Sequence, residues 1–209
     1  MKLKGIVFFV MINFGFVYSQ EKSMSQAEVK IFKATIEKET QKIKSLKTDF
    51  VQYKHLDFLE KDIETSGKMA FKNPNLLCWQ YTNPYQYSII FKNNKVYIND
   101  QGKKSSINAG NSKMFEKINK LIVGSVSGNL FDDEEFSIEY FKNKEFYITK
   151  LTPKTATIKK YIKLVELYFP IGESTVSQVR LIEPSNDFTK IVFKNKQLNA
   201  KIDDAVFNQ

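Results

Sequence analysis

Residues that commonly carry out chemistry are scarce in this chain of 209 residues. His55 is the only histidine and has no serine or cysteine nearby in a catalytic arrangement. We therefore expect it at the surface or in strand packing rather than in acid–base catalysis. Cys78 is the only cysteine, so no intrachain disulfide can form. Beside Trp79 it is interpreted as a small buried hydrophobic residue.

The sequence also contains none of the common catalytic or ligand-binding motifs. The sequence has no His-Glu-x-x-His, no cysteine pair, no calcium-loop spacing, no phosphate-binding glycine loop and no Gly-x-Ser-x-Gly. The acidic run Asp132–Glu135 could ligate a cation, but a solvated loop is the stronger interpretation. Lysines interspersed with aromatic residues do not form the clustered stripe that nucleic acids favour. We expect no catalytic site, no metal, no cofactor and no nucleic-acid partner.

The stretch Glu64–Pro84 offers apolar surface instead. It predicts two strands joined at Asn73-Pro74-Asn75, because Pro74 has no N–H for a ladder and disfavours helix at Asn73. One face of this hairpin collects five large side chains, Met69, Phe71, Leu77, Trp79 and Tyr81. The second strand is apolar on both faces, so both faces need a cover. An ordinary hairpin in an ordinary core is the alternative.

The N-terminus predicts export. Lys2 and Lys4 precede an apolar run over residues 5–17, which indicates a secretory signal peptide cut near Ser19. The run contains Asn13 and is short for a membrane span, so a retained anchor is the lesser interpretation. Residues 20–209 then form one domain. Loss of the two leader lysines leaves 30 basic against 23 acidic residues, a net charge of +7.

That positive charge is compatible with an anionic partner such as a membrane surface. The lysines, however, alternate with apolar residues along predicted strands. A solvated strand face is therefore the favoured explanation.

Two amphipathic helices are expected. Ser25-Gln26-Ala27-Glu28 is a capping box, and the apolar stripe that follows it predicts a helix ending near Leu46. This stripe consists of Val29, Phe32, Ile36, Ile43 and Leu46. A second helix follows residues 109–112 and ends by Gly124 or Gly128. Its apolar positions are Met114, Phe115, Ile118, Leu121 and Ile122.

The remaining chain predicts about ten or eleven antiparallel strands, from alternating residues and turn signals. They cover residues 48–58, the hairpin from 63 to 81, and then 85–91, 95–99, 103–107, 136–141, 146–151, 164–169, 176–182 and 188–193. Residues 155–162 are ambiguous, and the tail 198–207 includes a short element. The fold class is α+β, a single strongly bent sheet with helices over one face, because a sandwich would leave the helices uncovered.

A curved sheet under helices can keep a dry cavity suited to an acyl chain. Composition alone does not separate such a cavity from a core in which helices and sheet close on each other.

The order of several short segments resembles the LolA family, periplasmic carriers that bring lipoproteins to the outer membrane. The resemblance runs from Val29 to Phe207 and is strongest between Phe50 and Tyr97. Its signs are Phe50-Val51-Gln52, Ser66-Gly67-Lys68-Met69-Ala70-Phe71, Pro74-Asn75-Leu76-Leu77-Cys78-Trp79-Gln80-Tyr81, Thr82-Asn83-Pro84 and Asn94-Lys95-Val96-Tyr97.

The resemblance implies an incomplete, strongly twisted antiparallel β-barrel with a helical lid over an apolar cavity. The residues that would face the acyl chains are Phe50, Met69, Phe71, Leu77, Trp79 and Tyr81, with Ile118, Leu121 and Ile122 in the lid. It also implies a periplasmic monomer whose partners are acylated lipoproteins and an ATP-driven inner-membrane lipoprotein-release complex. An outer-membrane acceptor is left open.

The sequence departs from the family pattern twice. In well-studied family members an Arg just before the proline ties the lid shut. Here this position is Asn73, which lacks the charge and the fork of donors. Many relatives continue after the segment at Asp203–Phe207, so we expect delivery to differ. The alternative functions are a carrier or sensor of another lipid, such as a glycolipid or pigment ester, and a non-catalytic structural or interaction domain with a filled core.

Overall fold

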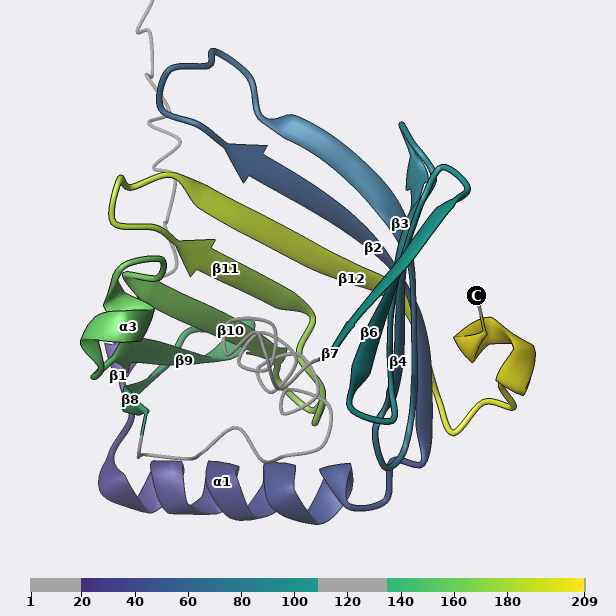
Figure 1. The fold of residues 1–209 in the computed structure, drawn as a ribbon. Coiled ribbons are helices and arrows are strands. Elements are labelled where there is room, and N and C mark those ends of the chain that lie inside the picture. Colours follow the sequence, from purple (N-terminus) through teal and green to yellow (C-terminus); the bar gives the residue numbers. More distant parts are fainter. Residues whose placement is uncertain (1–19, 109–134, 209) are drawn as a thin grey trace, which may run out of the picture.

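One long antiparallel sheet, sharply bent, makes up most of the molecule (Figure 1). The computed structural model describes residues 20–108 and 135–208. The strands are β1 (Lys22–Ser23), β2 (Ser45–His55), β3 (Ile63–Lys72), β4 (Leu76–Asn83), β5 (Tyr87–Lys92), β6 (Lys95–Asp100), β7 (Lys103–Asn108), β8 (Phe136–Lys142), β9 (Phe146–Pro153), β10 (Leu164–Pro170), β11 (Gln178–Ile182) and β12 (Phe188–Leu198). The helical elements are α1 (Gln26–Thr40), α3 (Ala156–Lys159) and the 3-10 helix η2 (Asp204–Phe207).

The order of strands in the sheet is β1-β8-β9-β10-β11-β12-β2-β3-β4-β5-β6-β7. The described strands leave the sheet open, with β1 and β7 at its edges. This confirms the predicted incomplete, twisted barrel. The eleven expected strands are all present, and the two-residue β1, paired with β8, is the additional one.

The helix α1 begins as predicted but ends earlier. Ser25 and Glu28 form the capping box, with the Ser25 N–H donating to the Glu28 carboxylate over 2.9 Å. The prediction that this helix extends to Leu46 is wrong, because α1 ends at Thr40 and Leu46 is the second residue of β2. Ile43 and Leu46 are nevertheless 4% and 2% exposed. The buried residues at helix-like spacing therefore do not belong to one helix: the first ones lie on α1, and Ile43 and Leu46 lie after its end.

Gly67 lies where the backbones of β3 and β4 approach each other closely. A Cβ at this position would lie 1.9 Å from the carbonyl oxygen of Gln80 on β4, closer than any real contact. The pairing of β3 with β4 also shifts register between Ser66 and Gly67. Only glycine lets the two backbones approach this closely, and such irregularities bend and twist a sheet.

Two hydrophobic clusters lie on the concave face. In the α1 cluster, helix residues pack on β8, β9 and β10; it contains Phe32, Ile36, Phe136, Leu151, Ile158, Ile162, Val165, Leu167, Phe169 and Val176. The Trp79 cluster is built mainly from β2–β6; it contains Ile43, Leu46, Phe50, Met69, Phe71, Leu77, Trp79, Phe91 and Val96. Phe193 of β12 packs against both clusters.

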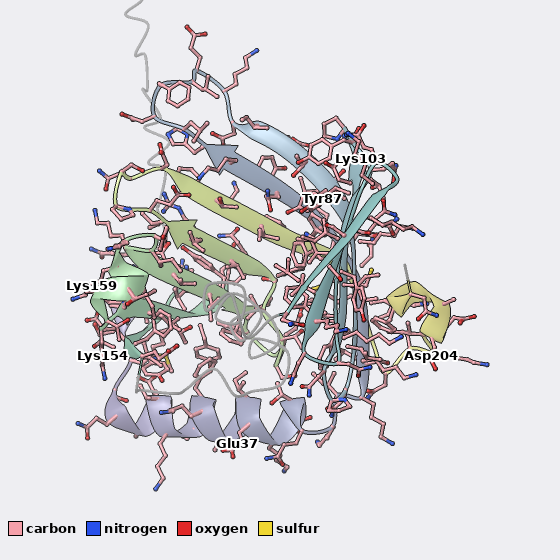
Figure 2. All side chains as sticks on the ribbon, viewed as in Figure 1. Glu37, Tyr87, Lys103, Lys154, Lys159 and Asp204 are labelled. Atoms are coloured by element: carbon pink, nitrogen blue, oxygen red, sulfur yellow. The ribbon has the colours of Figure 1, made fainter. Side chains whose placement is uncertain are left out.

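The convex face of the β3–β5 region is covered by the C-terminal segment. Ile202 and Phe207 pack there on Ala70, Cys78 and Ile90. The predicted cover is thus confirmed for this face of β4, and so is the predicted short element in the tail. Outside the sheet, Asp204 accepts from Lys72 over 2.5 Å and holds η2 in place (Figure 2).

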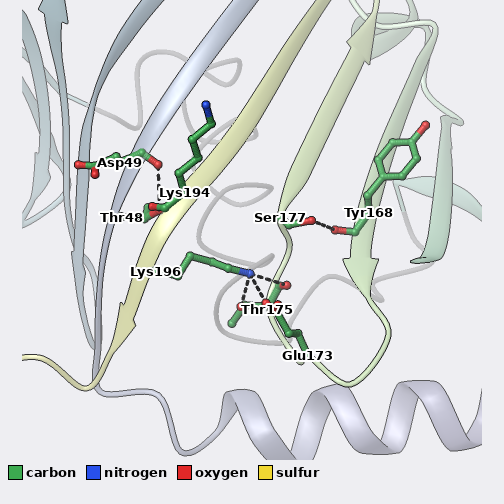
Figure 3. Close-up of polar contacts among 8 residues, drawn as sticks. All are labelled: Thr48, Asp49, Tyr168, Glu173, Thr175, Ser177, Lys194 and Lys196. Carbon is green, nitrogen blue, oxygen red and sulfur yellow. Dashed lines mark hydrogen bonds and ion pairs between the residues drawn. The ribbon is translucent and has the colours of Figure 1, made fainter. Parts of the chain in front are cut away.

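Polar contacts fix the end of β12 that lies nearest α1 (Figure 3). The Lys196 ammonium lies 2.5 Å from a Glu173 carboxylate oxygen and 3.1 Å from the Thr175 hydroxyl. The Thr48 hydroxyl donates to the Lys194 carbonyl oxygen over 2.7 Å. These contacts tie β12 to β2 on one side and to the loop after β10 on the other.

Candidate functional site

The Trp79 cluster contains the apolar residues that the sequence singled out on the sheet. Register places Met69 opposite Trp79, and Phe71 opposite Leu77. Strand alternation then directs all of them to the concave face, together with Phe50 from β2. Phe50 is 1% exposed and Trp79 5% exposed, while Tyr81 is half-buried at the margin of the cluster. The structure therefore brings the six predicted sheet residues together, and their contact with a ligand stays a prediction.

Aromatic rings make the centre of this cluster. The Phe50 and Trp79 ring centroids are 4.3 Å apart at an interplanar angle of 33°. Tyr81 meets Phe50 edge-on at 5.2 Å, and Phe193 meets Trp79 at 6.1 Å. Large rings of this kind bury much apolar area and hold specific geometries.

Sequence reasoning missed several neighbours of these rings. Four half-buried side chains extend the apolar face, Ile89, Ile98, Ile191 and Phe193. Each lies on a strand that was predicted correctly, and its alternation could have revealed which residues share its face. Which of a strand's two faces joins the cluster depends on register with β2 and β4, which local patterns do not encode.

Several predicted residues fall outside the described part of the chain. These are the signal peptide at 1–19, the second helix with Ile118, Leu121 and Ile122, and most of the acidic run 132–135. Asn73 is described and exposed in the turn between β3 and β4, where its N–H donates to the Lys44 carbonyl oxygen over 2.9 Å. Its role as a latch stays a prediction.

Polar groups interrupt the apolar face near Tyr81. The Tyr81 hydroxyl donates to the Gln52 amide oxygen over 3.1 Å. The Thr65 hydroxyl and the Trp79 indole N–H are buried and have no hydrogen-bond partner among the described residues. Burial raises the pKa of Tyr81, although Trp79 and Gln52 act in the opposite direction. The Trp79 N–H is thus close to the Tyr81 hydroxyl without reaching hydrogen-bond geometry.

His55 and Cys78, the two residues considered for chemistry, pack against neighbouring side chains and strands. His55 stacks on Phe188 at 4.7 Å and its Nδ1 lies 2.9 Å from an Asp62 oxygen, as expected for strand packing. Cys78 is 7% exposed, and burial raises the pKa of its thiol to about 11, which disfavours the reactive thiolate. Across residues 20–108 and 135–208 there is no group of three or more His, Cys, Asp or Glu side chains that could hold a metal. The same residues contain no helix long and apolar enough to cross a membrane.

Comparison with known proteins gives a family and a set of related folds. The family model described as "Outer membrane lipoprotein carrier protein LolA" matches residues 41–209. A search of curated proteins gives no match.

Solved structures resemble this fold at low sequence identity. MucB has 8% identity and a TM-score of 0.52, over 88% of this chain and 63% of MucB. The Pseudomonas aeruginosa MucA/MucB complex gives 8% identity and a TM-score of 0.50, over 86% of this chain and 60% of that chain. A LolA superfamily protein from Nitrosomonas europaea has 9% identity and a TM-score of 0.41, over 84% and 97%. This chain thus spans less than two thirds of the MucB chains, and at these identities the likeness concerns the fold alone.

The family match confirms the resemblance that the ordered segments had indicated. It covers most of the chain and includes all six predicted residues of the Trp79 cluster and its margin. The chain therefore belongs to the outer membrane lipoprotein carrier protein LolA family.

Proposed function

We propose that this protein is a non-catalytic carrier that binds the acyl chains of lipoproteins on its concave face and shuttles them from the inner to the outer membrane. The Trp79 cluster carries the proposal. Together with its half-buried margin it forms a broad apolar face of the sheet, buried in this structure, to which no described helix contributes a residue. A surface of this kind fits an elongated apolar ligand better than a small polar substrate.

The energetics of transport support such a surface. Each methylene group removed from water is worth about 0.8 kcal/mol. A long acyl chain therefore cannot cross an aqueous compartment unshielded. Because the chain must also be released, the site has to be adaptable rather than rigidly complementary. Met69 among the aromatic rings is suited to this, since its flexible side chain fills irregular gaps.

We take the setting of the proposed cycle from what the family resemblance implies. Acylated lipoproteins are the cargo, an ATP-driven inner-membrane lipoprotein-release complex supplies the energy, and the protein works as a periplasmic monomer after cleavage near Ser19. The outer-membrane acceptor is left open. In the proposed cycle, Ile118, Leu121 and Ile122 would belong to a lid that swings outward on loading, and Asn73 is the position at which a latch would act.

A charged residue in the cluster tests the proposal. Trp79→Glu should abolish loading of an acylated lipoprotein while leaving far-UV circular dichroism nearly unchanged, because a carboxylate cannot be buried against acyl chains. Gln80→Glu is the matched control, since Gln80 is the next residue of β4 and is exposed on the other face. Normal loading by Trp79→Glu would contradict the proposal.

Identification of the natural cargo separates the alternatives. The mature protein is purified from its native envelope, and bound molecules are identified by mass spectrometry. Bound lipoprotein supports the carrier. Free glycolipid or pigment ester supports a carrier or sensor of another lipid, and a protein with nothing bound supports a structural or interaction domain with a filled core.

A further inference from the structure

The polar groups near Tyr81 lie together at one end of the Trp79 cluster. Gln52 of β2 and Thr65 of β3 are direct cross-strand partners, and opposite side chains in such a pair lie about 5 Å apart at Cβ. Tyr81 of β4 pairs with Gly67, and its hydroxyl reaches Gln52 of β2 across β3. Three strands thus place Gln52, Thr65 and Tyr81 on one patch of the concave face.

This patch is rich in hydrogen-bond donors that have no acceptor among the described residues. The Gln52 amide oxygen already accepts from Tyr81, which leaves the Gln52 amide N–H groups without an acceptor among the described residues. The Thr65 hydroxyl, on a residue that is 4% exposed, is also unpartnered. So is the indole N–H of Trp79, which is 5% exposed. Buried donors without acceptors are rare in folded proteins and call for an explanation.

The charges nearby indicate what kind of acceptor is missing. Lys54 follows Gln52 on the same face of β2, but its ammonium is already paired with Glu183. Tyr87 lies at the same end of the sheet (Figure 2) and is the cross-strand partner of Asp100. Burial is the main reason why the pKa of Tyr87 is raised, and the negative charge of Asp100 raises it further. A free carboxylate or phosphate would therefore meet no unpaired cation among the described residues of this patch. A neutral acceptor, a carbonyl oxygen, fits the donors better.

We propose that Gln52, Thr65 and the Trp79 indole form a donor site for the ester or amide carbonyl groups that join acyl chains to the head of the cargo. The inference rests on the proposed carrier function and adds a selectivity to it. The hydrocarbon tails lie along Phe50, Trp79 and Met69, and the carbonyl end points toward Tyr81. Lipids with ester- or amide-linked chains are thereby favoured over ether-linked lipids of equal length.

Two synthetic ligands isolate the carbonyl groups. Dipalmitoylglycerol and its dihexadecyl ether analogue have the same chain length and the same free hydroxyl, but only the first has carbonyl oxygens. Binding to the mature protein is followed by the emission of Trp79, the only tryptophan of the chain. We expect the wild-type protein to bind the diester about tenfold more tightly than the diether, as two to three modest hydrogen bonds would give.

Isosteric variants assign that preference to the named residues. Thr65→Val and Gln52→Leu should each lower the ratio of diester to diether affinity while leaving diether affinity unchanged. Thr149→Val is the matched control, because the Thr149 hydroxyl is likewise buried and unpartnered among the described residues but lies on β9, away from this patch. Its ratio should stay at the wild-type value. A carbonyl-labelled diester should also show an infrared stretch at lower wavenumber in wild type than in Thr65→Val.

The outcomes separate this inference from the proposed function. Equal affinity for both ligands in the wild-type protein would overturn the donor site and leave acyl binding intact. Equal losses for both ligands in Thr65→Val would also overturn it, since that result indicates a purely structural hydroxyl. Failure of both ligands to bind would overturn the proposed function, and the donor site with it.

Discussion

The α1 cluster and the Trp79 cluster lie on the same face of one sheet but differ in how they are closed. In the α1 cluster, Phe32 and Ile36 of the helix cap the strands, and Phe32 packs edge-on against Phe169 at 5.3 Å. The Trp79 cluster contains no residue from a described helix and is centred on aromatic rings and Met69. One end of the sheet is thus closed by a described helix, and the other end is where we propose that acyl chains bind.

The largest expected effect belongs to the α1 cluster. Phe169→Ala removes a side chain that is 0% exposed, and truncation of this kind costs about 3–5 kcal/mol of unfolding free energy. Chemical denaturation measures the loss. Phe58→Ala is the control, because Phe58 is 80% exposed and its truncation should change stability by less than about 0.5 kcal/mol.

Loading of the folded Phe169→Ala molecules should be normal. A loading defect in molecules that are fully folded would show that the α1 cluster also takes part in binding, and the contrast between the two clusters would fail.

A smaller effect sharpens the contrast. Thr65→Val and Thr149→Val each replace a buried, unpartnered hydroxyl with a methyl group, so each should raise the stability of the empty protein by about 1 kcal/mol. Thermal unfolding measures both gains. Only the variant in the Trp79 region should lose ester preference, because only there does the hydroxyl have a proposed ligand. Destabilisation by Thr65→Val would indicate that its hydroxyl already has a partner.

The smallest effect concerns pH and the helix. The hydrogen bond from Lys142, helped by the Ser25 backbone N–H, lowers the pKa of Glu28 from 4.5 to about 2. The carboxylate therefore stabilises the start of α1 above about pH 4.5, and this contribution is lost as the pH falls toward 2. We expect the melting temperature to fall over this window and the fall to be smaller in Glu28→Gln.

Glu37→Gln on the solvent side of α1 (Figure 2) is the control and should keep the wild-type pH dependence. Diester affinity measured over the same window should not follow Glu28, because α1 contributes nothing to the Trp79 cluster. Parallel loss of affinity and helix content would contradict the separation of the two regions.

Much of the fold could be predicted because strands with one buried face alternate visibly. The hairpin at residues 63–83 is the clearest case, with its turn set by Pro74. The end of α1 could not be predicted, because Ile43 and Leu46 continue the helical spacing while lying in a turn and a strand. The neighbours of β2 were also out of reach, since β12 pairs with it from far along the chain.

The site divides in the same way. Phe50, Met69, Phe71, Leu77, Trp79 and Tyr81 were found because they alternate locally or resemble the family's segments. Thr65 and Gln52 were missed as a pair, because their proximity depends on the register of β2 against β3. An unpartnered hydroxyl is a property of three-dimensional packing and leaves no trace in composition or periodicity.

The close packing of β3 against β4 depends on the absence of a side chain at Gly67. The β4 backbone passes where any other residue would hold its first carbon atom, and Tyr81, the cross-strand partner of Gly67, donates a hydrogen bond to Gln52. The path of the β4 backbone and the position of the Tyr81 hydroxyl thus both depend on Gly67. A single substitution of this glycine would therefore change both the twist of the sheet and the hydrogen bond between Tyr81 and Gln52.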